Sequence, residues 1–164
     1  MAKQEVLHVI AQQLDANAAA RCLQTITAAD SATFERKVFY PYHRFSADCT
    51  VPTMFGKESL SVTCLVDGVN ALGATTDPFE VERITVAPEE VMTMKVLNDE
   101  AHRAAYRILM HQMSRRLKMI ASFDICLAKR GIVYKVFWIL RSRDVLFMVD
   151  SVTGGMHPLR ALAA

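Results

Sequence analysis

The chain lacks the features that mark several classes of protein. It has only 6 glycines and 5 prolines among 164 residues, which excludes collagen-like and low-complexity sequences. No apolar run approaches the roughly 20 residues of a membrane-spanning helix. The N-terminal residues 1–5 lead into no apolar segment of the signal-peptide type. We therefore expect a soluble, cytoplasmic protein with no membrane partner.

Motifs for cofactor chemistry are also missing. The four cysteines form no C-x-x-C pair and have no histidine at metal-ligand spacing; they are Cys22, Cys49, Cys64 and Cys126. None of G-x-x-x-x-G-K-[ST], G-x-G-x-x-G, H-E-x-x-H or G-x-S-x-G occurs. These absences remove the commonest signatures of nucleotide-binding proteins, zinc proteases and α/β-hydrolases. We expect reduced thiols, no bound metal and no cofactor.

The composition that remains is typical of one globular domain over residues 1–164, with 52% hydrophobic and 22% charged residues. The net charge is +2, but residues 1–97 hold 8 Lys/Arg against 12 Asp/Glu, whereas residues 98–164 hold 11 against 5. Opposite charges either draw the two halves together or mark a polar partner surface.

Three segments are expected: a helical N-terminus (1–30), a first β unit with an acidic connector (33–97), and a helix with a second β unit (98–164).

Three helices are predicted from periodicity and capping. Leu7, Ile10 and Leu14 recur at helical spacing over residues 3–14. Asp15 can cap a short alanine-rich helix over residues 16–23, and Asn98 can cap the main helix over residues 99–119. The main helix has an apolar face with Ala105, Tyr106, Leu109, Met110, Met113 and Leu117, and a polar face with Arg103, Arg107, His111, Ser114 and Lys118.

The rest of the chain predicts strands and tight turns. The aromatic run 38–45 contains Pro41, which cannot donate to a ladder and so predicts an edge strand or a bulge. Further strands are expected over residues 46–51, 59–66, 69–75, 80–86, 122–127, 132–140 and 145–149, with turns at 52–57, 67–68, 129–131, 142–144 and 151–155. The fold class is therefore α+β: N-terminal helices and one long helix packed on a mainly antiparallel sheet of six to eight strands.

Two stretches of the chain resemble each other. Each has an aromatic strand containing tyrosine, at residues 38–42 and 132–138, followed by a strand that ends in Val-Asp, at 66–67 and 149–150. The two Val-Asp pairs are 83 residues apart. This similarity predicts a loosely duplicated hairpin unit.

Residues 98–156 also resemble a known family. A helix is followed by the run Phe137-Trp138-Ile139 and by Val149-Asp150-Ser151-Val152-Thr153-Gly154. This order is similar to PepSY-type modules. The resemblance implies a helix lying across an antiparallel sheet, and only this expectation about the fold is carried over.

Four residues are candidates for catalysis. Asp67 and Asp150 stand at matched strand ends and could share acid–base work, but an aspartate in a turn more often accepts hydrogen bonds from its own backbone. His43, beside Tyr42, is the best single proton-transfer candidate. No serine or cysteine can be paired with it from spacing, so a surface histidine on a strand is the favoured interpretation. A small-molecule or catalytic pocket between helix and sheet remains the alternative.

A basic cluster on the main helix raises a further alternative. Arg103, Arg107 and Lys118 could bind phosphates of a nucleic acid. Cations near a helix C-terminus also favour the helix dipole, and a solvated face or a contact with the acidic connector accounts for most of the cluster. Nucleic acid is therefore not the expected partner.

The favoured function is a non-enzymatic role in protein binding or self-assembly. The aromatic strand 38–45 is expected near an edge, and exposed edges need a cover. A second copy of the chain could supply that cover, because two-fold dimers are the commonest oligomers. The sequence thus predicts a homodimer with Phe39 or Tyr42 in its interface, and another protein as a further possible partner.

Overall fold

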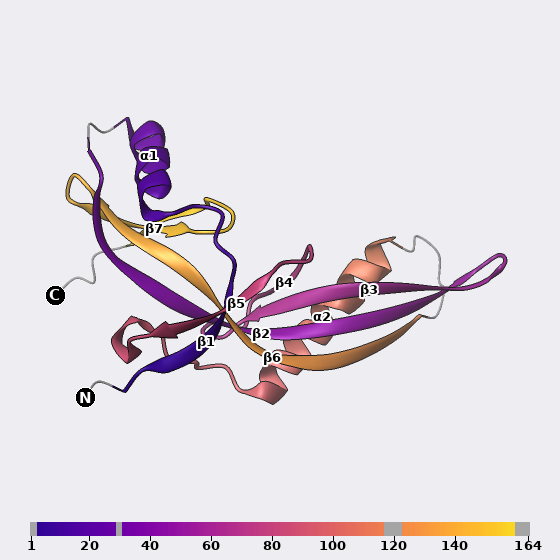
Figure 1. Ribbon diagram of the computed structural model, residues 1–164. Coiled ribbons are helices and arrows are strands. Elements are labelled where there is room, and N and C mark those ends of the chain that lie inside the picture. The colour runs from indigo at the N-terminus through magenta and orange to yellow at the C-terminus, as the bar shows by residue number, and fades with distance from the viewer. Residues whose placement is uncertain (1–2, 29–30, 117–122, 160–164) are drawn as a thin grey trace. The chain divides into compact units, whose positions relative to one another are not determined.

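The computed structural model describes residues 3–28, 31–116 and 123–159. Within these ranges the protein is α+β, as predicted, with two α-helices and a mainly antiparallel sheet (Figure 1). The elements in chain order are β1 (Glu5–Ile10), α1 (Ala16–Thr27), β2 (Thr33–Thr53), β3 (Gly56–Asp67), β4 (Gly73–Thr76), β5 (Val81–Val86), the 3-10 turn η1 (Pro88–Glu90), α2 (Asn98–Arg116), β6 (Asp124–Ser142), β7 (Val145–Asp150) and β8 (Met156–Leu159). Neither described helix is long and apolar enough to cross a membrane.

The chain forms two compact units, and each draws on both halves of the sequence. Unit 1 comprises residues 1–40, 80–92 and 134–164, and unit 2 comprises residues 41–79 and 93–133. The two longest strands, β2 and β6, therefore contribute residues to both units. The unit boundaries do not follow the three predicted segments, and residues 98–156 are divided between the units.

Unit 1 is built around β1, β5, α1 and the strands β6, β7 and β8. β1 pairs with β5, β6 with β7, and β7 with β8, all antiparallel. Ala19 and Leu23 of α1 are fully buried in its core. Their core partners on the strands are Leu7, Val9, Phe39, Val86, Val136, Trp138, Leu140 and Val149.

Unit 2 pairs β2 with β3 and β3 with β4, again antiparallel, and α2 packs on these strands. Its core has two parts. Near the start of α2, Ala101, Ala104 and Ala105 pack with Phe45, Cys64, Val66 and Val96. Further along the helix, Leu109 and Met113 pack with Ala47, Cys49 and Val51.

The units share a common plan. In unit 2 the β2–β3 hairpin has Tyr42 opposite Asp67 at its base, and in unit 1 the β6–β7 hairpin has Phe137 opposite Asp150. The third strand of each meander then pairs in the same register, with Val66 opposite Gly73 and Val149 opposite Met156.

The predicted helix over residues 3–14 is wrong. Residues 5–10 form strand β1, in which Leu7 and Val9 are buried and His8 between them is exposed. Leu7 and Ile10 fit a helical period, whereas Leu7 and Val9 alternate as in a strand, and so short a segment cannot separate the two patterns. Pairing with β5 decides the outcome, since every residue of β1 from Glu5 to Ile10 has a partner in β5 and the backbone groups on that side of the strand are satisfied.

The predicted edge strand is also wrong. β2 lies between β3 and β6 in the sheet, and Pro41 is fully buried. Pro41 stands one residue before the β2–β3 ladder begins, and its carbonyl accepts a hydrogen bond from Gly68 N–H at 2.9 Å. Phe39 is only 1% exposed in a single chain, so the argument that this strand needs a second copy to cover it fails.

Other boundaries differ in detail. The predicted turn at 129–131 is instead part of the continuous strand β6, with Gly131 at a φ of +90° that favours glycine. The strand expected over 69–75 is shortened to β4, because residues 68–70 extend the turn. On α2, Tyr106 of the predicted apolar face is 44% exposed, and the predicted end of that helix lies outside the described residues.

The two helix caps have different outcomes. Asp15 Oδ1 accepts a hydrogen bond from Ala18 N–H at 2.7 Å, which confirms the predicted cap of α1. α2 begins at Asn98 itself, and the Asn98 side chain accepts a hydrogen bond from Lys129.

We predict that Asp15→Ala lowers the free energy of unfolding by about 1 kcal/mol, because the first turn of α1 loses its side-chain acceptor. Urea denaturation measures the change. Asp15→Asn keeps an acceptor oxygen and should stay within a few tenths of the native value. Equal losses for both variants would contradict the capping role.

Candidate functional site

Asp67 and Asp150 organise two turns of the same construction. Asp67 Oδ1 accepts from Val69 and Asn70 N–H at 2.8 and 3.1 Å, and Asp150 Oδ1 accepts from Val152 and Thr153 N–H at the same two distances. The favoured structural interpretation of both aspartates agrees with these contacts. Asp67 belongs to unit 2 and Asp150 to unit 1.

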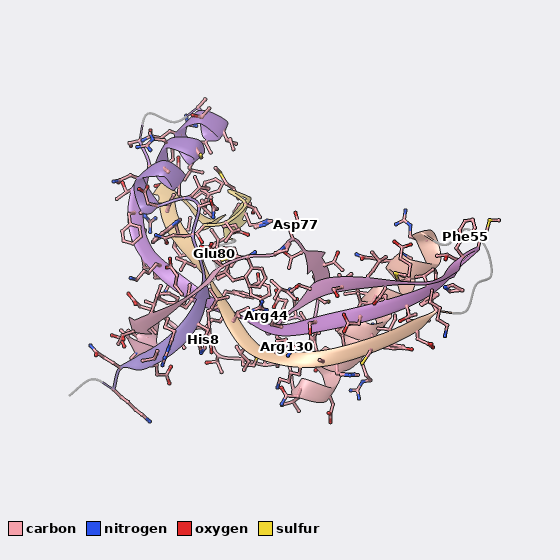
Figure 2. The ribbon with its side chains drawn as sticks, turned by 45° about the vertical axis from the view of Figure 1, so that its right-hand side comes forward. His8, Arg44, Phe55, Asp77, Glu80 and Arg130 are labelled. Atoms are coloured by element: carbon pink, nitrogen blue, oxygen red, sulfur yellow. The ribbon has the colours of Figure 1, made fainter. Side chains whose placement is uncertain are left out.

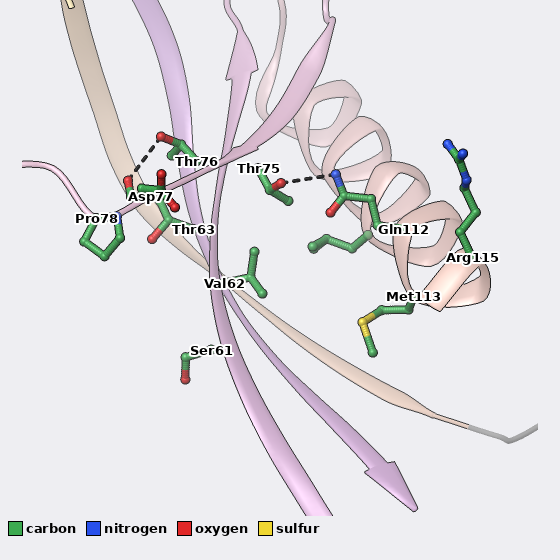
Figure 3. A pocket seen from close by; sticks show the side chains of 11 residues that line it. Ser61, Val62, Thr63, Thr75, Thr76, Asp77, Pro78, Gln112, Met113 and Arg115 are labelled. Atoms are coloured by element: carbon green, nitrogen blue, oxygen red, sulfur yellow. Dashed lines mark hydrogen bonds between the residues drawn. The ribbon is translucent and has the colours of Figure 1, made fainter. Parts of the chain in front are cut away.

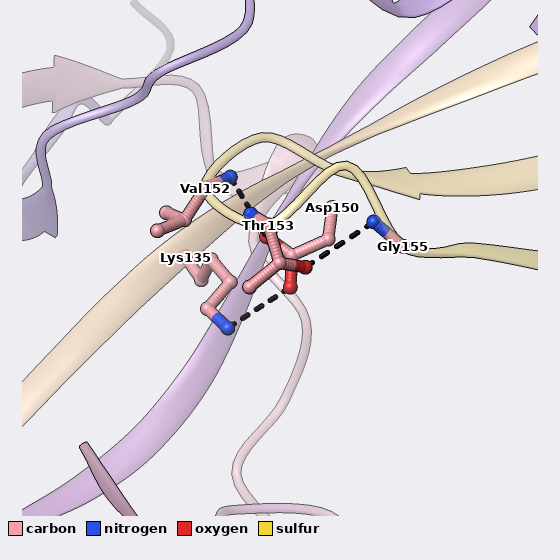
Figure 4. A network of polar contacts seen from close by, with 5 residues as sticks. All are labelled: Lys135, Asp150, Val152, Thr153 and Gly155. Carbon is pink, nitrogen blue, oxygen red and sulfur yellow. Dashed lines mark hydrogen bonds and ion pairs between the residues drawn. The ribbon is translucent and has the colours of Figure 1, made fainter. Parts of the chain in front are cut away.

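Asp150 carries an additional ion pair. Lys135 Nζ lies 3.0 Å from Asp150 Oδ2, and both side chains are largely buried (Figure 4). Burial has the largest effect and raises the pKa of Asp150. The backbone donors Val152 and Thr153 and the Lys135 ammonium outweigh it and hold that pKa below its ordinary value. Asp150 is therefore ionised at neutral pH. Its hydrogen bonds to the turn and its ion pair with Lys135 of β6 hold the turn against that strand.

His43 is a buried residue, and the expectation of a surface histidine is wrong. Its side chain is 1% exposed, and Nε2 lies 2.8 Å from the carbonyl oxygen of Val96, two residues before α2. Because a carbonyl only accepts, Nε2 carries the proton and donates it. Trp138 has the matching role in unit 1, where Nε1–H donates to Leu14 O at 2.9 Å, two residues before α1.

The catalytic candidates do not form one constellation. Tyr42 lies opposite Asp67 across the β2–β3 ladder, whereas His43, its neighbour in sequence, points to the opposite face of the strand. His43 Nδ1 has no hydrogen-bond partner among the described residues. No cluster of ligand side chains in the described ranges could hold a metal ion. Burial raises the pKa of the Cys64 thiol to about 11, which keeps it protonated.

Two basic residues of α2 lie on its exposed face. Arg103 and Arg107 are exposed on either side of Tyr106. Lys118, the third residue of the predicted basic patch, lies outside the described residues.

A polar groove opens in unit 2, and none of the predicted candidate residues is among those that line it (Figure 3). Its volume is about 730 Å³. Hydroxyl groups dominate its walls, Gln112 donates to Thr75 Oγ1 at 3.1 Å, and Leu109 and Met113 of α2 supply apolar surface. The hydroxyl-bearing lining residues are Ser61, Thr63, Thr75 and Thr76, and the charged ones are Asp77 and Arg115.

The groove follows an open edge of strand β3. β4 pairs with β3 only between Thr63 and Val66, and the chain leaves the sheet at Pro78. Continued in register, Pro78 would stand opposite Ser61 without an N–H to donate. In the part of the chain that the structure describes, no strand pairs with this side of β3 before Thr63.

The backbone groups on this edge can be assigned individually. Asp67 N–H points to the β4 side, because it donates to Leu72 O at 2.7 Å. Backbone groups alternate between the two sides of an antiparallel strand, so every second residue before Asp67 points the same way. Lys57, Ser59 and Ser61 therefore present their N–H and C=O groups at the open edge.

This edge belongs to an extension that unit 1 lacks. The β6–β7 hairpin turns after Ser142, whereas the β2–β3 hairpin continues to Thr53. Its tip carries Met54 and Phe55, which are 94% and 98% exposed, and Figure 2 shows Phe55 at the far end of the hairpin. The corresponding turn of the shorter hairpin is polar, with Arg143 and Asp144.

Comparisons with known proteins find no relative. No protein-family model matches the chain, and no curated protein or solved structure is significantly similar to it. The groove, the open edge and the apolar tip therefore carry the functional argument.

Sequence reasoning did not identify these three features. The groove depends on where β4 ends beside α2, which no local pattern reveals. One signal for the tip was present, because Met54 and Phe55 are apolar residues inside the predicted turn at 52–57. Turns are normally polar, so such a pair indicates a contact with something else.

We predict that His43→Phe destabilises the protein by about 1–3 kcal/mol, since it leaves the buried Val96 carbonyl without its donor. Thermal denaturation measures the loss. Trp138→Phe, which removes the matching donor to Leu14, should cost a similar amount. A His43→Phe protein as stable as the native chain would contradict a stabilising role for this hydrogen bond.

We predict a pH-dependent effect of Asp150→Asn. The pKa of Asp150 is lowered in the folded protein, so its stabilisation is present above the unfolded pKa of about 3.9 and disappears as the pH falls through the folded value. At neutral pH the variant should lose about 1–3 kcal/mol. The difference from the native protein should shrink below about pH 4.

Lys135→Met provides the matched control for that prediction. If the 3.0 Å ion pair is responsible, the double variant should lose less than the sum of the two single losses. Strict additivity, or a pH-independent effect of Asp150→Asn, would contradict it.

Proposed function

We propose that the protein is a non-enzymatic binding domain that takes up an extended polypeptide along the open edge of β3. The observation that carries this proposal is the set of outward backbone groups on Lys57, Ser59 and Ser61, which lie beside a groove of about 730 Å³. Strand addition uses such an edge for affinity and neighbouring pockets for selectivity.

The groove offers what an added strand needs. A strand on this edge continues the line of β4, with α2 on one side of it. Alternate side chains of the guest then meet Leu109 and Met113, while the hydroxyl groups and Gln112 accommodate polar groups. The charged residues Asp77 and Arg115 give the groove both signs of charge, which favours a guest without a large net charge.

The internal similarity of the chain supports the same location. We infer a duplication in which the helix, the long strand and the following meander occur twice, since the two aspartate turns and the two ring donors match. The hairpin beyond Ala47 and the last turns of α2 have no counterpart among the described residues of unit 1. A part that the repeated scaffold does not need is where a specific binding surface is expected.

We predict that peptides selected from a random dodecapeptide library bind at this edge. Hydrogen exchange should show the amides of Ser59 and Ser61 exchanging rapidly in the free chain and becoming protected in the complex. Ser59→Pro removes one outward donor and should weaken binding up to about tenfold per hydrogen bond lost.

Ser59→Ala is the matched control, because it removes the hydroxyl and keeps the backbone N–H. It should bind the same peptides with native affinity. Selected peptides that bind Ser59→Pro and the native chain equally, or that protect amides elsewhere, would overturn the proposal.

A further inference from the structure

We propose that the strand added along β3 is the β3 strand of a second copy of this chain, paired antiparallel about a two-fold axis at Ser59. This inference rests on the strand addition proposed above and names its partner. It differs from the homodimer predicted by sequence, which used the buried residues around Phe39.

The open edge is bounded at both ends, and its bounds define one register. The hairpin tip limits it at Gly56, and β4 limits it at Thr63. Ser59 is the centre of the three outward residues. A two-fold axis at Ser59 pairs Ser59 with Ser59 of the other copy, and Lys57 with Ser61.

That register satisfies every outward backbone group on the open edge. In an antiparallel ladder, two residues that both point toward the partner exchange two hydrogen bonds. Ser59 makes such a pair with its own copy, and Lys57 and Ser61 make two more pairs by symmetry. A shift of the axis to Ser61 would bring the partner strand onto β4, which already occupies the edge at Thr63. A shift to Lys57 would leave Ser61 unpaired.

The same arrangement brings the apolar hairpin tip of each copy next to the groove of the other copy. Continued past Lys57, the register places Gly56 of each copy opposite Val62 of the other, so the turn that carries Phe55 comes beside the end of β4, which occupies the edge from Thr63 onward. The groove lined by Thr76, Leu109 and Met113 opens at this point. The most exposed apolar side chains of the hairpin, Met54 and Phe55, thus come beside a groove that has apolar surface.

Contact area supports the inclusion of the tip. Stable dimers bury about 1,200–2,000 Å² in total, which two short strand edges do not reach. An aromatic side chain buries about 150–250 Å². Two Phe55 side chains therefore add about 300–500 Å², and the two Met54 side chains and the groove surface under the tips add further area that the strand edges lack.

The charges at the tip are balanced between Lys57 and Glu58. A tip that inserts into an anionic membrane is expected to carry an excess of positive charge, so a protein surface is the better occupant.

Disulfide trapping tests the register directly. We predict that Ser59→Cys, with exposed Cys126 replaced by Ser, forms a covalent dimer under mild oxidation. Cα atoms of a hydrogen-bonded antiparallel pair are about 5.5 Å apart, which suits a disulfide. Ser61→Cys in the same background should not cross-link to itself, because its two copies would lie four residues apart, about 14 Å. Mixing it with Lys57→Cys should restore cross-linking.

Sedimentation provides an independent readout on the native chain. We expect a species of about twice 18.3 kDa at micromolar concentration, which Ser59→Pro and the double change Met54→Arg with Phe55→Asp convert to monomer. The double change copies the polar turn at Arg143 and Asp144, so the hairpin should still fold, as circular dichroism can verify. Ser59→Ala should stay dimeric.

The outcomes separate this inference from the proposed function. A monomeric native chain that still binds selected peptides at Ser59 and Ser61 would overturn the second copy as partner and leave strand addition intact. A dimer that Ser61→Cys traps, and Ser59→Cys does not, would overturn the register. A native chain that is monomeric and binds no peptide at this edge would overturn both the strand addition and the second copy as its partner. Binding of the native chain to phosphatidylserine vesicles, lost with Met54→Arg and Phe55→Asp, would assign the tip to a membrane instead.

Discussion

β2 and β6 run without interruption from one compact unit into the other, and this continuity determines which segments make up each unit. Each strand begins in one unit and ends in the other, so each unit takes its helix from one half of the sequence and its meander from the other half. The difference in net charge between the two units is therefore smaller than the difference between the two halves of the sequence. By sequence, unit 1 contains 9 Lys/Arg and 10 Asp/Glu residues. Unit 2 contains 10 Lys/Arg and 7 Asp/Glu residues. Neither unit carries the net charge of a half chain, since by sequence the net charge is −1 in unit 1 and +3 in unit 2, against −4 and +6 in the two halves.

Both units solve the same local problems with the same chemistry. A helix must start beside the turn that closes a hairpin, and in each unit the carbonyl of a turn residue, Gly68 or Ser151, accepts two backbone hydrogen bonds from the segment that leads into the helix. A backbone carbonyl two residues before the helix then accepts a hydrogen bond from a ring nitrogen. The donor is His43 in unit 2 and Trp138 in unit 1. This correspondence explains why a buried histidine can be structural. The interest of unit 2 lies in what it adds to the shared plan: a longer hairpin, a longer helix and an edge that no described strand covers.

Local signals in the sequence were reliable where the local chemistry decides the structure. The cap at Asp15 and the turns at Asp67 and Asp150 depend on side chains that bond to backbone a few residues away, so their spacing suffices. The failures came where distant pairing decides. Residues 5–10 fit a helix until β5 supplies a partner, and Pro41 indicates an edge until the sheet surrounds it. Gly131 was predicted to lie in a turn, but it lies within the continuous strand β6.

Local patterns in the sequence were sufficient to predict an α+β protein with antiparallel strands, tight turns and no common cofactor motif, because periodicity, turn chemistry and short motifs are properties of neighbouring residues. They did not determine which half of a long strand belongs to which unit, or that His43 is buried. They also did not determine the candidate site. The open edge arises because β4 stops at Thr76 while β3 extends back to Gly56, and the groove arises because α2 runs on beside that edge. Both features depend on contacts between segments that are far apart in the sequence, since an edge is open only where no other strand pairs with it.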